Sequence, residues 1–304
     1  QVPAASDVDG TIAGYQLATD VGTGNGTLTF NPNGSYTFDP GHDFDSLPAG
    51  VSRDVTFTYQ AQDDSGALSA PQTITITVTG TNDAPVAQAG SATTEENTVL
   101  NGQVPAASDV DGTIASYQLA TDVGTGNGTL TFNPNGSYTF DPGHDFDSLP
   151  VGVSRDVSFT YQAQDDSGAL SAPQTITITV TGTNDAPIAQ AGSATTEENT
   201  ILNGQVPAAS DVDGTIAGYQ LATDVGTGNG TLTFNPNGSY TFDPGHDFDS
   251  LPAGVSRDVT FTYQAQDDSG ALSAPQTITI TVTGTNDAPV AQAGSATTEE
   301  NTVL

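Results

Sequence analysis

The chain has 304 residues, with 36 Asp or Glu against three Lys or Arg, which gives a formal net charge of −33. This balance excludes nucleic acid as a partner, because phosphate binding needs clustered cationic side chains, and it argues against direct contact with an anionic membrane. Cysteine is absent, which excludes disulfides and zinc–thiolate sites, and no apolar run approaches the ~20 residues of a membrane span.

The sequence is a threefold repeat with a period of 102 residues. Residues 1–100 and 205–304 are identical, and the middle copy differs from them at five positions. A unit of this length is a whole domain with its own core. We predict the following domains: a first repeat at 1–83 that lacks its first strand, complete second and third repeats at 84–185 and 186–287, and the first strand of a further repeat at 288–304. Both ends fall inside a repeat, which predicts an internal segment of a longer protein.

In the second repeat, strands are predicted at 98–104 and 113–121, and then a hairpin in which NPNG joins TLTF to SYTF. Gly136 of that turn is suited to a positive φ. Residues 156–164 place Val157, Phe159, Tyr161 and Ala163 on one face, and TITITVT at 175–181 alternates apolar residues with threonine. Such period-two patterns indicate strands with one buried face. About seven short strands per period, without helical periodicity, predict an all-β, immunoglobulin-like sandwich.

Adjacent repeats meet at the sequence TGTNDAP, which ends at Pro85, Pro187 and Pro289. Proline fixes its own φ and pushes the preceding residue toward an extended conformation. A linker this short leaves almost no slack between one sandwich and the next. It is unlike a flexible Gly/Ser spacer.

The acidic residues gather in loops of five kinds: SDVDG, PGHDFD, QDDSG, TNDAP and TEEN. Calcium takes about six to eight oxygen ligands from carboxylates, amides and carbonyls, and alternate residues of an extended loop turn their oxygens toward one ion. We predict calcium ligands, serving about three to five ions per repeat. The predicted ligands are Asp7, Asp9, Asp43, Asp45, Asp63, Asp64, Asn82, Asp83, Glu95, Glu96, Asp109, Asp111, Asp145, Asp147, Asp165, Asp166, Asn184, Asp185, Glu197, Glu198, Asp211, Asp213, Asp247, Asp249, Asp267, Asp268, Asn286, Asp287, Glu299 and Glu300.

Two alternatives compete with calcium. Asp and Asn are good turn residues, which accounts for single aspartates but not for five clusters almost without counter-cations. Magnesium keeps its waters and rarely builds all-protein cages, so it suits these loops less well.

The stretch YQAQDDSGALSAPQTITITVTGTNDAP, with ASDVDG upstream, resembles the tandem VCBS and cadherin-like repeats of giant RTX-type bacterial adhesins, over every repeat in full. The resemblance implies calcium bound within domains and at their junctions. At the junction of the second and third repeats it implies the ligands Glu96, Asp145, Asp147, Asn184, Asp185, Asp211, Asp213 and Asp267. The linker reads GTND where cadherins have D-x-N-D, which implies one ligand fewer.

The resemblance also implies an extracellular, cell-surface location and an extender role. Near-identical repetition favours a spacer over an enzyme, because a spacer gains reach from every copy. The expected function is therefore a calcium-stiffened extender that projects ligand-binding domains for cell adhesion or biofilm formation. The alternative is a module that itself binds a glycan or a partner protein. The expected partners are neighbouring repeats of the same chain, and head-to-tail strand complementation between copies.

Overall fold

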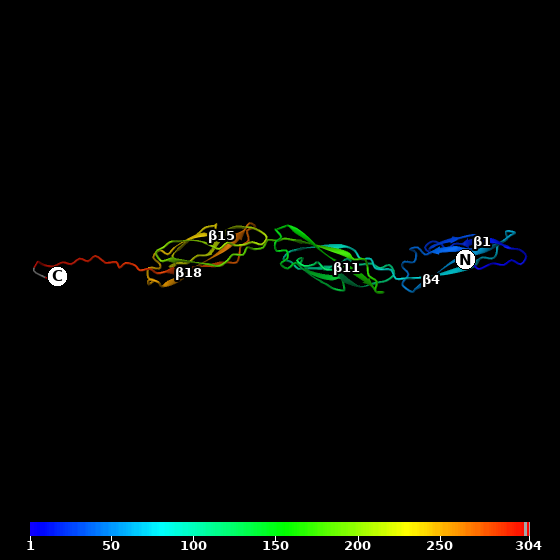
Figure 1. The fold of residues 1–304 in the computed structure, drawn as a ribbon, viewed down its shortest axis with the longest axis horizontal. Helices are drawn as coiled ribbons and strands as arrows, with labels where there is room; N and C mark the ends of the chain where they lie inside the picture. The colour runs from blue at the N-terminus through cyan, green and yellow to red at the C-terminus, as the bar shows by residue number, and fades with distance from the viewer. Residues whose placement is uncertain (301–302, 304) are drawn as a thin grey trace. The chain divides into compact units, whose positions relative to one another are not determined.

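The computed structural model describes residues 1–300 and 303. The chain divides into two compact units, residues 1–145 with 155–180 and residues 146–154 with 181–304. Every regular element among the described residues is a β-strand (Figure 1), as the period-two patterns predict. The described residues include no helix that is long and apolar enough to cross a membrane.

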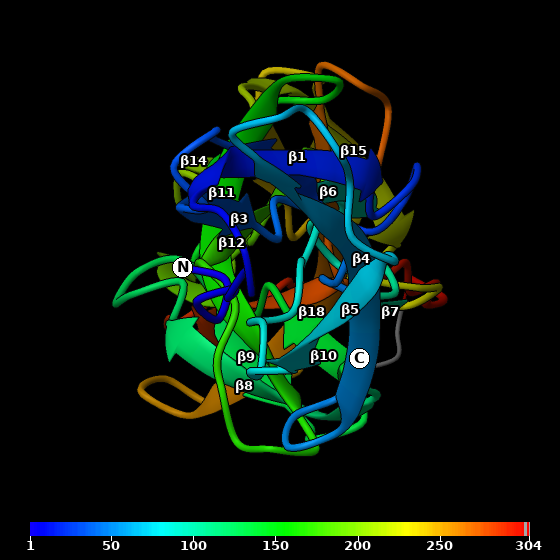
Figure 2. The same ribbon diagram turned by 90° about the vertical axis from the view of Figure 1, so that its right-hand side faces the viewer.

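The first repeat has five strands in two sheets. They are β1 (Ile12–Thr19), β2 (Thr27–Phe30), β3 (Tyr36–Asp39), β4 (Ser52–Asp63) and β5 (Gln72–Thr79). One sheet has the order β1-β4-β5, and the other pairs β2 with β3. Figure 2 shows β4 and β5 side by side.

The second repeat has seven strands, in agreement with the predicted number, although β6 lies outside the ranges that the sequence predicts. They are β6 (Gly90–Glu95), β7 (Leu100–Gln103), β8 (Ile114–Thr121), β9 (Thr129–Phe132), β10 (Ser137–Asp141), β11 (Ser154–Asp165) and β12 (Gln174–Thr181). The sheet orders are β6-β12-β11-β8 and β7-β10-β9. The predicted hairpin is confirmed, with Phe132 opposite Tyr138 and Leu130 opposite Phe140, and Gly136 has a φ of 82°.

The third repeat has the same two sheets. Its strands are β13 (Gly192–Glu197), β14 (Leu202–Gln205), β15 (Ile216–Thr223), β16 (Thr231–Phe234), β17 (Ser239–Asp243), β18 (Ser256–Asp267) and β19 (Gln276–Thr283). The sheet orders are β13-β19-β18-β15 and β14-β17-β16. Strand β13 pairs with β19 in parallel, whereas β18 pairs with both β15 and β19 in antiparallel fashion.

The core of the third repeat lies between its two sheets. Phe261 on β18 meets Phe234 of β16 and Tyr240 of β17 edge-on, with ring centroids 6.0 and 5.0 Å apart. The inward residues of β19, Ile278 and Ile280, are almost fully buried. Threonines take the outward positions, which suits a half-buried pleated surface. The predicted all-β sandwich fold is confirmed.

Candidate cation-binding ends of the repeats

The SDVDG loop places two carboxylates at the N-terminal end of the third repeat. Oδ1 of Asp211 accepts hydrogen bonds from the main-chain N–H groups of Asp213 and Gly214, at 3.3 and 3.1 Å. A Cβ atom at Gly214 would lie 2.9 Å from Oδ1 of Asp268 and 3.4 Å from Oδ2 of Asp211. Glycine at this position therefore lets carboxylates from two separate loops approach each other closely.

The QDDSG loop contributes two aspartates with different surroundings. Asp267 is buried, and its Oδ1 accepts the N–H of Ala271 at 2.7 Å. Asp268 is exposed, and its Oδ2 accepts the hydroxyl of Thr215 at 3.0 Å. The second aspartate thus fastens this loop to the residue that follows SDVDG.

The linker residues complete this cluster. The side-chain amide of Asn184 donates to Oδ2 of Asp267 at 2.8 Å, and the main-chain N–H of Asp185 donates to Oδ1 of Asp213 at 3.4 Å. We call this set, Asn184, Asp185, Asp211, Asp213 and Asp267, the entry cluster of the third repeat. Three of the five predicted acidic motifs therefore come together at one end of the sandwich.

The second repeat has an entry cluster of the same kind, formed by Asn82, Asp83, Asp109, Asp111 and Asp165. Asn82 donates to Asp165 at 2.8 Å, and the N–H of Asp83 lies 3.3 Å from both carboxylate oxygens of Asp111. The outer aspartate, Asp166, accepts the Thr113 hydroxyl at 2.9 Å.

The entry clusters concentrate negative charge in partly desolvated positions. Burial raises the pKa of Asp213, and the neighbouring Asp211 carboxyl raises it further. Burial likewise raises the pKa of Asp111, with Asp109 adding to the effect. Among the described residues, nothing donates a hydrogen bond to the buried Oδ2 atoms of Asp109, Asp211 and Asp213. Buried carboxylate oxygens without donors are costly, and a cation would relieve that cost.

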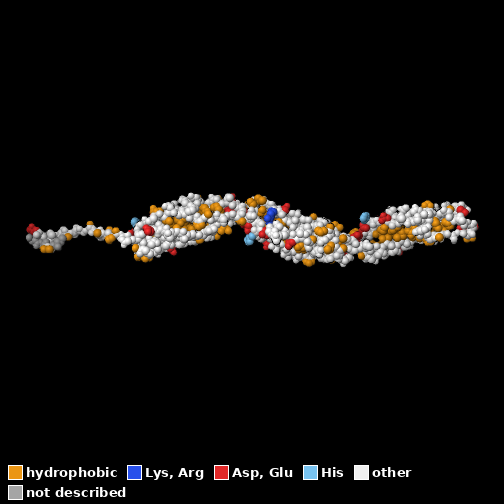
Figure 3. All heavy atoms as spheres, viewed as in Figure 1, with side chains coloured by type: hydrophobic (Ala, Val, Ile, Leu, Met, Phe, Trp, Pro, Cys, Tyr) orange, Lys and Arg blue, Asp and Glu red, His pale blue; other side chains and the backbone are white. Residues whose placement is uncertain are grey.

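The single arginine of the third repeat lies elsewhere. The guanidinium of Arg257 stacks over the ring of Phe248 at 4.0 Å and donates to the carbonyl of Gly228 at 3.0 Å. It therefore holds in place the Gly-rich loop, residues 226–230 with the sequence GTGNG. In the face shown in Figure 3, acidic side chains gather toward the ends of the sandwiches, whereas the broad faces are mostly uncharged.

The TEEN motif divides into one exposed and one buried glutamate. Glu197 is exposed, whereas Glu198 is fully buried. Oε1 of Glu198 accepts the N–H of Thr285 at 2.6 Å and its hydroxyl at 3.0 Å, while nothing among the described residues donates to its Oε2. Glu95 is likewise exposed and Glu96 buried. Glu198 thus marks the C-terminal end of the third repeat, next to the linker residues 285–287.

The aspartates of the PGHDFD loop mainly form hydrogen bonds that hold this region of the loops in place. Oδ2 of Asp247 accepts the N–H of Gly230 at 2.8 Å, and Asp249 contacts Nδ1 of His246 at 3.0 Å. In the first repeat, the hydrogen bond that His42 makes to the Asp45 carboxylate raises the pKa of His42. In the other two repeats the N–H of Gly26 donates to Asp43 at 2.7 Å, and the N–H of Gly128 donates to Asp145 at 2.8 Å.

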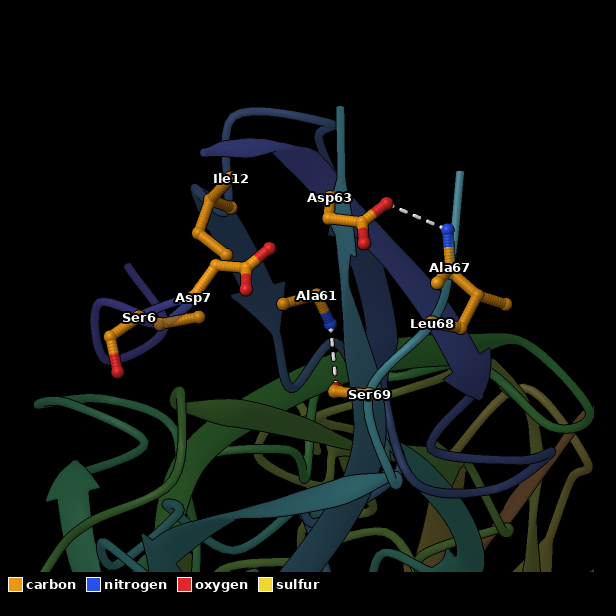
Figure 4. A pocket seen from close by; sticks show the side chains of 9 residues that line it. Ser6, Asp7, Ile12, Ala61, Asp63, Ala67, Leu68 and Ser69 are labelled. Atoms are coloured by element: carbon orange, nitrogen blue, oxygen red, sulfur yellow. Dashed lines mark hydrogen bonds between the residues drawn. The ribbon is translucent and has the colours of Figure 1, made fainter. Parts of the chain in front are cut away.

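The remaining predicted ligands lie in more open surroundings. Asp147 is half-buried, Asp45 and Asp83 line a hollow of ≈ 200 Å³ at the end of the first repeat, and Asn286, Asp287, Glu299 and Glu300 are exposed. In the first repeat, Asp7 and Asp63 are half-buried, whereas Asp9 and Asp64 are exposed. Asp7 and Asp63 line a hollow of ≈ 220 Å³ between the SDVDG and QDDSG loops (Figure 4).

The distances between side chains in these clusters bear on which ligands a metal ion would need. In the part of the chain that the structure describes, no three Asp, Glu, His or Cys side chains converge closely enough to hold a metal ion. A calcium shell at an entry cluster would need amide and main-chain oxygens in addition to carboxylates, which calcium accepts readily. Sequence reasoning missed the threonines at 215 and 285, whose hydroxyls orient the carboxylates. Their position directly beside each acidic motif was the available signal.

The solved structures that the chain matches include several cadherin domains. The four domains EC1-4 of Drosophila N-cadherin are 19% identical, with 89% of this chain and 67% of that chain covered and a TM-score of 0.35. Protocadherin gamma B2 domains 3-6 are 16% identical, with 90% and 67% covered and a TM-score of 0.37. Chicken VE-cadherin EC1-2 is 19% identical, with 66% and 98% covered and a TM-score of 0.28. No protein of curated function matches the chain in sequence.

A family model described as "Bacterial cadherin-like domain" matches residues 1–80, 82–182 and 184–284. Cadherin-like domains are extracellular, generally bind Ca²⁺, and typically serve as structural or adhesion modules rather than enzymes. The three matches cover almost the whole sequence, with one match in each repeat. The chain therefore belongs to the bacterial cadherin-like domain family, as three tandem copies.

Proposed function

We propose that this chain is a calcium-stiffened extender segment of a large, secreted bacterial surface adhesin of the RTX type. Its repeats project ligand-binding domains away from the cell for adhesion or biofilm formation. The observation that carries the proposal is the set of buried carboxylate oxygens without donors at the ends of the repeats, on Asp109, Asp211, Asp213 and Glu198.

Calcium is the cation that suits these positions. The candidate metal ligands are all oxygen atoms, from carboxylates and from the side-chain amide of Asn184. The chain has neither cysteine nor clustered histidine. Hard oxygen ligands supplied by several loops favour Ca²⁺ over zinc and over magnesium. In the entry cluster of the third repeat, Asp211 and Asp213 would hold the ion, with Asp185 and Asp267 beside them.

Stiffening follows from where the ligands come from. Asn184 and Asp185 belong to the linker, whereas Asp211, Asp213 and Asp267 belong to loops of the sandwich. An ion held by both sets fixes the linker against the sandwich, and it removes the repulsion among the carboxylates. A ligand that binds only the folded state also stabilises it, by about 2.7 kcal/mol per site at a hundredfold excess over Kd.

The alternative of a glycan-binding module has less support. Stacking platforms for sugars need exposed aromatic rings, and every Phe and Tyr of the chain is buried or half-buried. The aromatic rings instead form the cores of the sandwiches.

Thermal unfolding with calcium, with magnesium and with excess chelator tests the ion, and small-angle scattering under the same conditions tests the stiffening. We expect a higher midpoint and a narrower spread of dimensions with calcium alone. The double variant Asp211→Asn/Asp213→Asn should lose much of the calcium response, whereas Asp258→Asn, which removes an exposed carboxylate on a sheet face, should keep it. Equal midpoints with calcium and chelator would rule the proposal out.

A further inference from the structure

The chain contains Asn-Gly pairs in three different structural surroundings. The main-chain nitrogen that follows an asparagine can close a five-membered ring with the side-chain carbonyl carbon, and glycine places no Cβ atom in the way. The pairs lie in the NPNG turns, the GTGNG loops and the LNGQ strands. They begin at Asn33, Asn135 and Asn237, at Asn25, Asn127 and Asn229, and at Asn101 and Asn203, respectively.

In the NPNG turn of the third repeat, the side chain of Asn237 is folded forward along the chain. Its Oδ1 accepts the N–H of Ser239, two residues on, at 3.0 Å, which is an Asx turn. The asparagine is exposed, and no hydrogen bond from its Nδ2 is found among the described residues. The closed Asx ring contains the nitrogen of Gly238. The turn therefore holds the side-chain carbonyl carbon of Asn237 beside the nitrogen of the next residue and leaves the amide group free to depart.

A second donor reaches the same oxygen atom. Oγ of Ser239 donates to Oδ1 of Asn237 at 2.7 Å, and the side-chain amide of Asn235 donates to that Oγ at 3.0 Å. Because Oγ accepts from Asn235, its own proton is directed toward Asn237. Two donors on one carbonyl oxygen make the carbonyl carbon more electrophilic and stabilise the negative charge that develops on the oxygen during attack. The first and second repeats have the same bonds.

The Gly-rich loop holds its asparagine in the opposite direction. Nδ2 of Asn229 donates to the carbonyl of Val225, four residues earlier, at 2.9 Å, and the residue is half-buried. The carboxylate of Asp247 accepts the N–H of Gly230 at 2.8 Å and is placed to take its proton. The side chain of Asn229 is nevertheless turned back along the chain, with its amide group bonded. We therefore expect this asparagine to be protected.

The Asn-Gly pair in strand β14 is held by the sheet. Oδ1 of Asn203 accepts the hydroxyl of Thr241 at 3.1 Å, and the two residues lie opposite each other on β14 and β17. The side chain therefore points across the sheet, and strand pairing keeps the main chain extended. Ring closure at this asparagine would require the pairing to open.

We propose that the NPNG turns, at Asn33, Asn135 and Asn237, are sites at which the chain modifies itself by intramolecular deamidation. The nitrogen of Gly238 forms a bond to Cγ of Asn237, the Cγ–Nδ2 bond breaks, and the N–H proton leaves with the amide group as ammonia. Water then opens the resulting succinimide at one of its two carbonyl groups, which gives aspartate or isoaspartate. The N–H of Gly238 must first leave its hydrogen bond to the carbonyl of Asn235, at 2.9 Å.

The modification changes both the charge and the packing of the turn. Each event adds a carboxylate to a chain with a net charge of −33. An isoaspartyl link also adds a methylene group to the main chain beside Gly238, which is buried. A Cβ atom at Gly238 would lie 2.8 Å from Cγ2 of Val206 and 2.9 Å from Cδ2 of Tyr219. The longer link has little room there, so we expect the hairpin of β16 and β17 to loosen. None of the predicted calcium ligands takes part.

Peptide mass spectrometry of the full chain, incubated at mildly alkaline pH, measures the reaction at each Asn-Gly pair. We expect Asn237 and its equivalents to lose ammonia at least about tenfold faster than Asn229, Asn203 and theirs. In urea the rates should converge, because every one of these asparagines then precedes a glycine in an unfolded chain. Reaction at Asn229 as fast as at Asn237 in the folded chain would overturn the proposal. Slower reaction at Asn237 in the folded chain than in urea would overturn it as well.

The contribution of the Ser239 hydroxyl can be measured within one molecule. Ser239→Ala removes one donor and should slow the reaction at Asn237 by about tenfold, the effect of one hydrogen bond to a developing charge. Asn135, which keeps its own serine at 137, is the matched control in the same chain and should react as before. Ser239→Thr keeps a hydroxyl and should restore most of the rate. An unchanged rate at Asn237 in Ser239→Ala would contradict the proposed activation.

Discussion

The first and third repeats have identical sequences over residues 1–83 and 205–287, yet their last strands differ in burial. Strand β19 is paired with β13 and its apolar residues are almost fully buried, whereas among the described residues the second edge of β5 is open and its apolar residues are half-buried. Asp267 is 1% exposed and accepts a hydrogen bond from Asn184, whereas Asp63 is half-buried. Each sandwich therefore depends on the residues between TNDAP and TEEN to complete its core and its entry cluster.

The largest expected difference concerns matched core truncations. Ile278→Ala should destabilise the third repeat by about 2–5 kcal/mol, because it opens a cavity in a closed core. Ile74→Ala should cost the first repeat clearly less, because water already reaches that site. The chain has no tryptophan, so Phe234→Trp or Phe30→Trp gives each repeat its own fluorescence signal in urea unfolding. Equal losses in the two repeats would mean that the open edge has no energetic consequence.

A smaller difference is expected for the linker asparagines. Asn184 donates to the buried Asp267, whereas among the described residues the amide of Asn286 donates only to the carbonyl of Asp287, at 3.3 Å. Asn184→Ala should therefore lower the thermal-unfolding midpoint of the third repeat by several degrees. Asn286→Ala should leave that midpoint almost unchanged.

The hydrogen bond from Asn184 to Asp267 also predicts that the stability of the third repeat depends on pH. The hydrogen bond from Asn184 is the main cause that lowers the pKa of Asp267 below its ordinary value of 3.8. A depressed folded-state pKa contributes stability that is present above the ordinary value and is lost as the pH falls through the folded value. Acid unfolding of Asn184→Ala, followed in chelator, should begin at a higher pH than that of the natural chain. Identical acid-unfolding profiles of the variant and the natural chain would show that the Asn184 hydrogen bond does not lower the pKa of Asp267.

The strands were predictable from sequence because their determinant is local. Alternation in residues 156–164 and 175–181 selects one face for the core, and NPNG fixes the hairpin register through Gly136. The convergence of SDVDG, QDDSG and the linker at one end was predictable only through the family resemblance. It depends on pairings between residues far apart in the chain.

Other properties of the candidate site could not be read from the sequence. TEEN does not reveal that Glu197 faces water while Glu198 is buried, because both positions are acidic and the strand β13 ends between them. PGHDFD does not reveal that Asp247 holds the Gly-rich loop through Gly230. These roles depend on which loop lies opposite, which no local pattern encodes.

The smallest expected difference concerns a buried tyrosine. The hydroxyl of Tyr263 donates to the carbonyl of Gln190 at 2.6 Å, and the equivalent Tyr59 has no such bond among the described residues. Tyr263→Phe should cost the third repeat about 1 kcal/mol, and Tyr59→Phe should cost the first repeat almost nothing. Urea unfolding of both variants, read with the repeat-specific tryptophans, measures this difference. Equal costs for the two variants would show that the hydroxyl of Tyr263 gains nothing from its bond to Gln190.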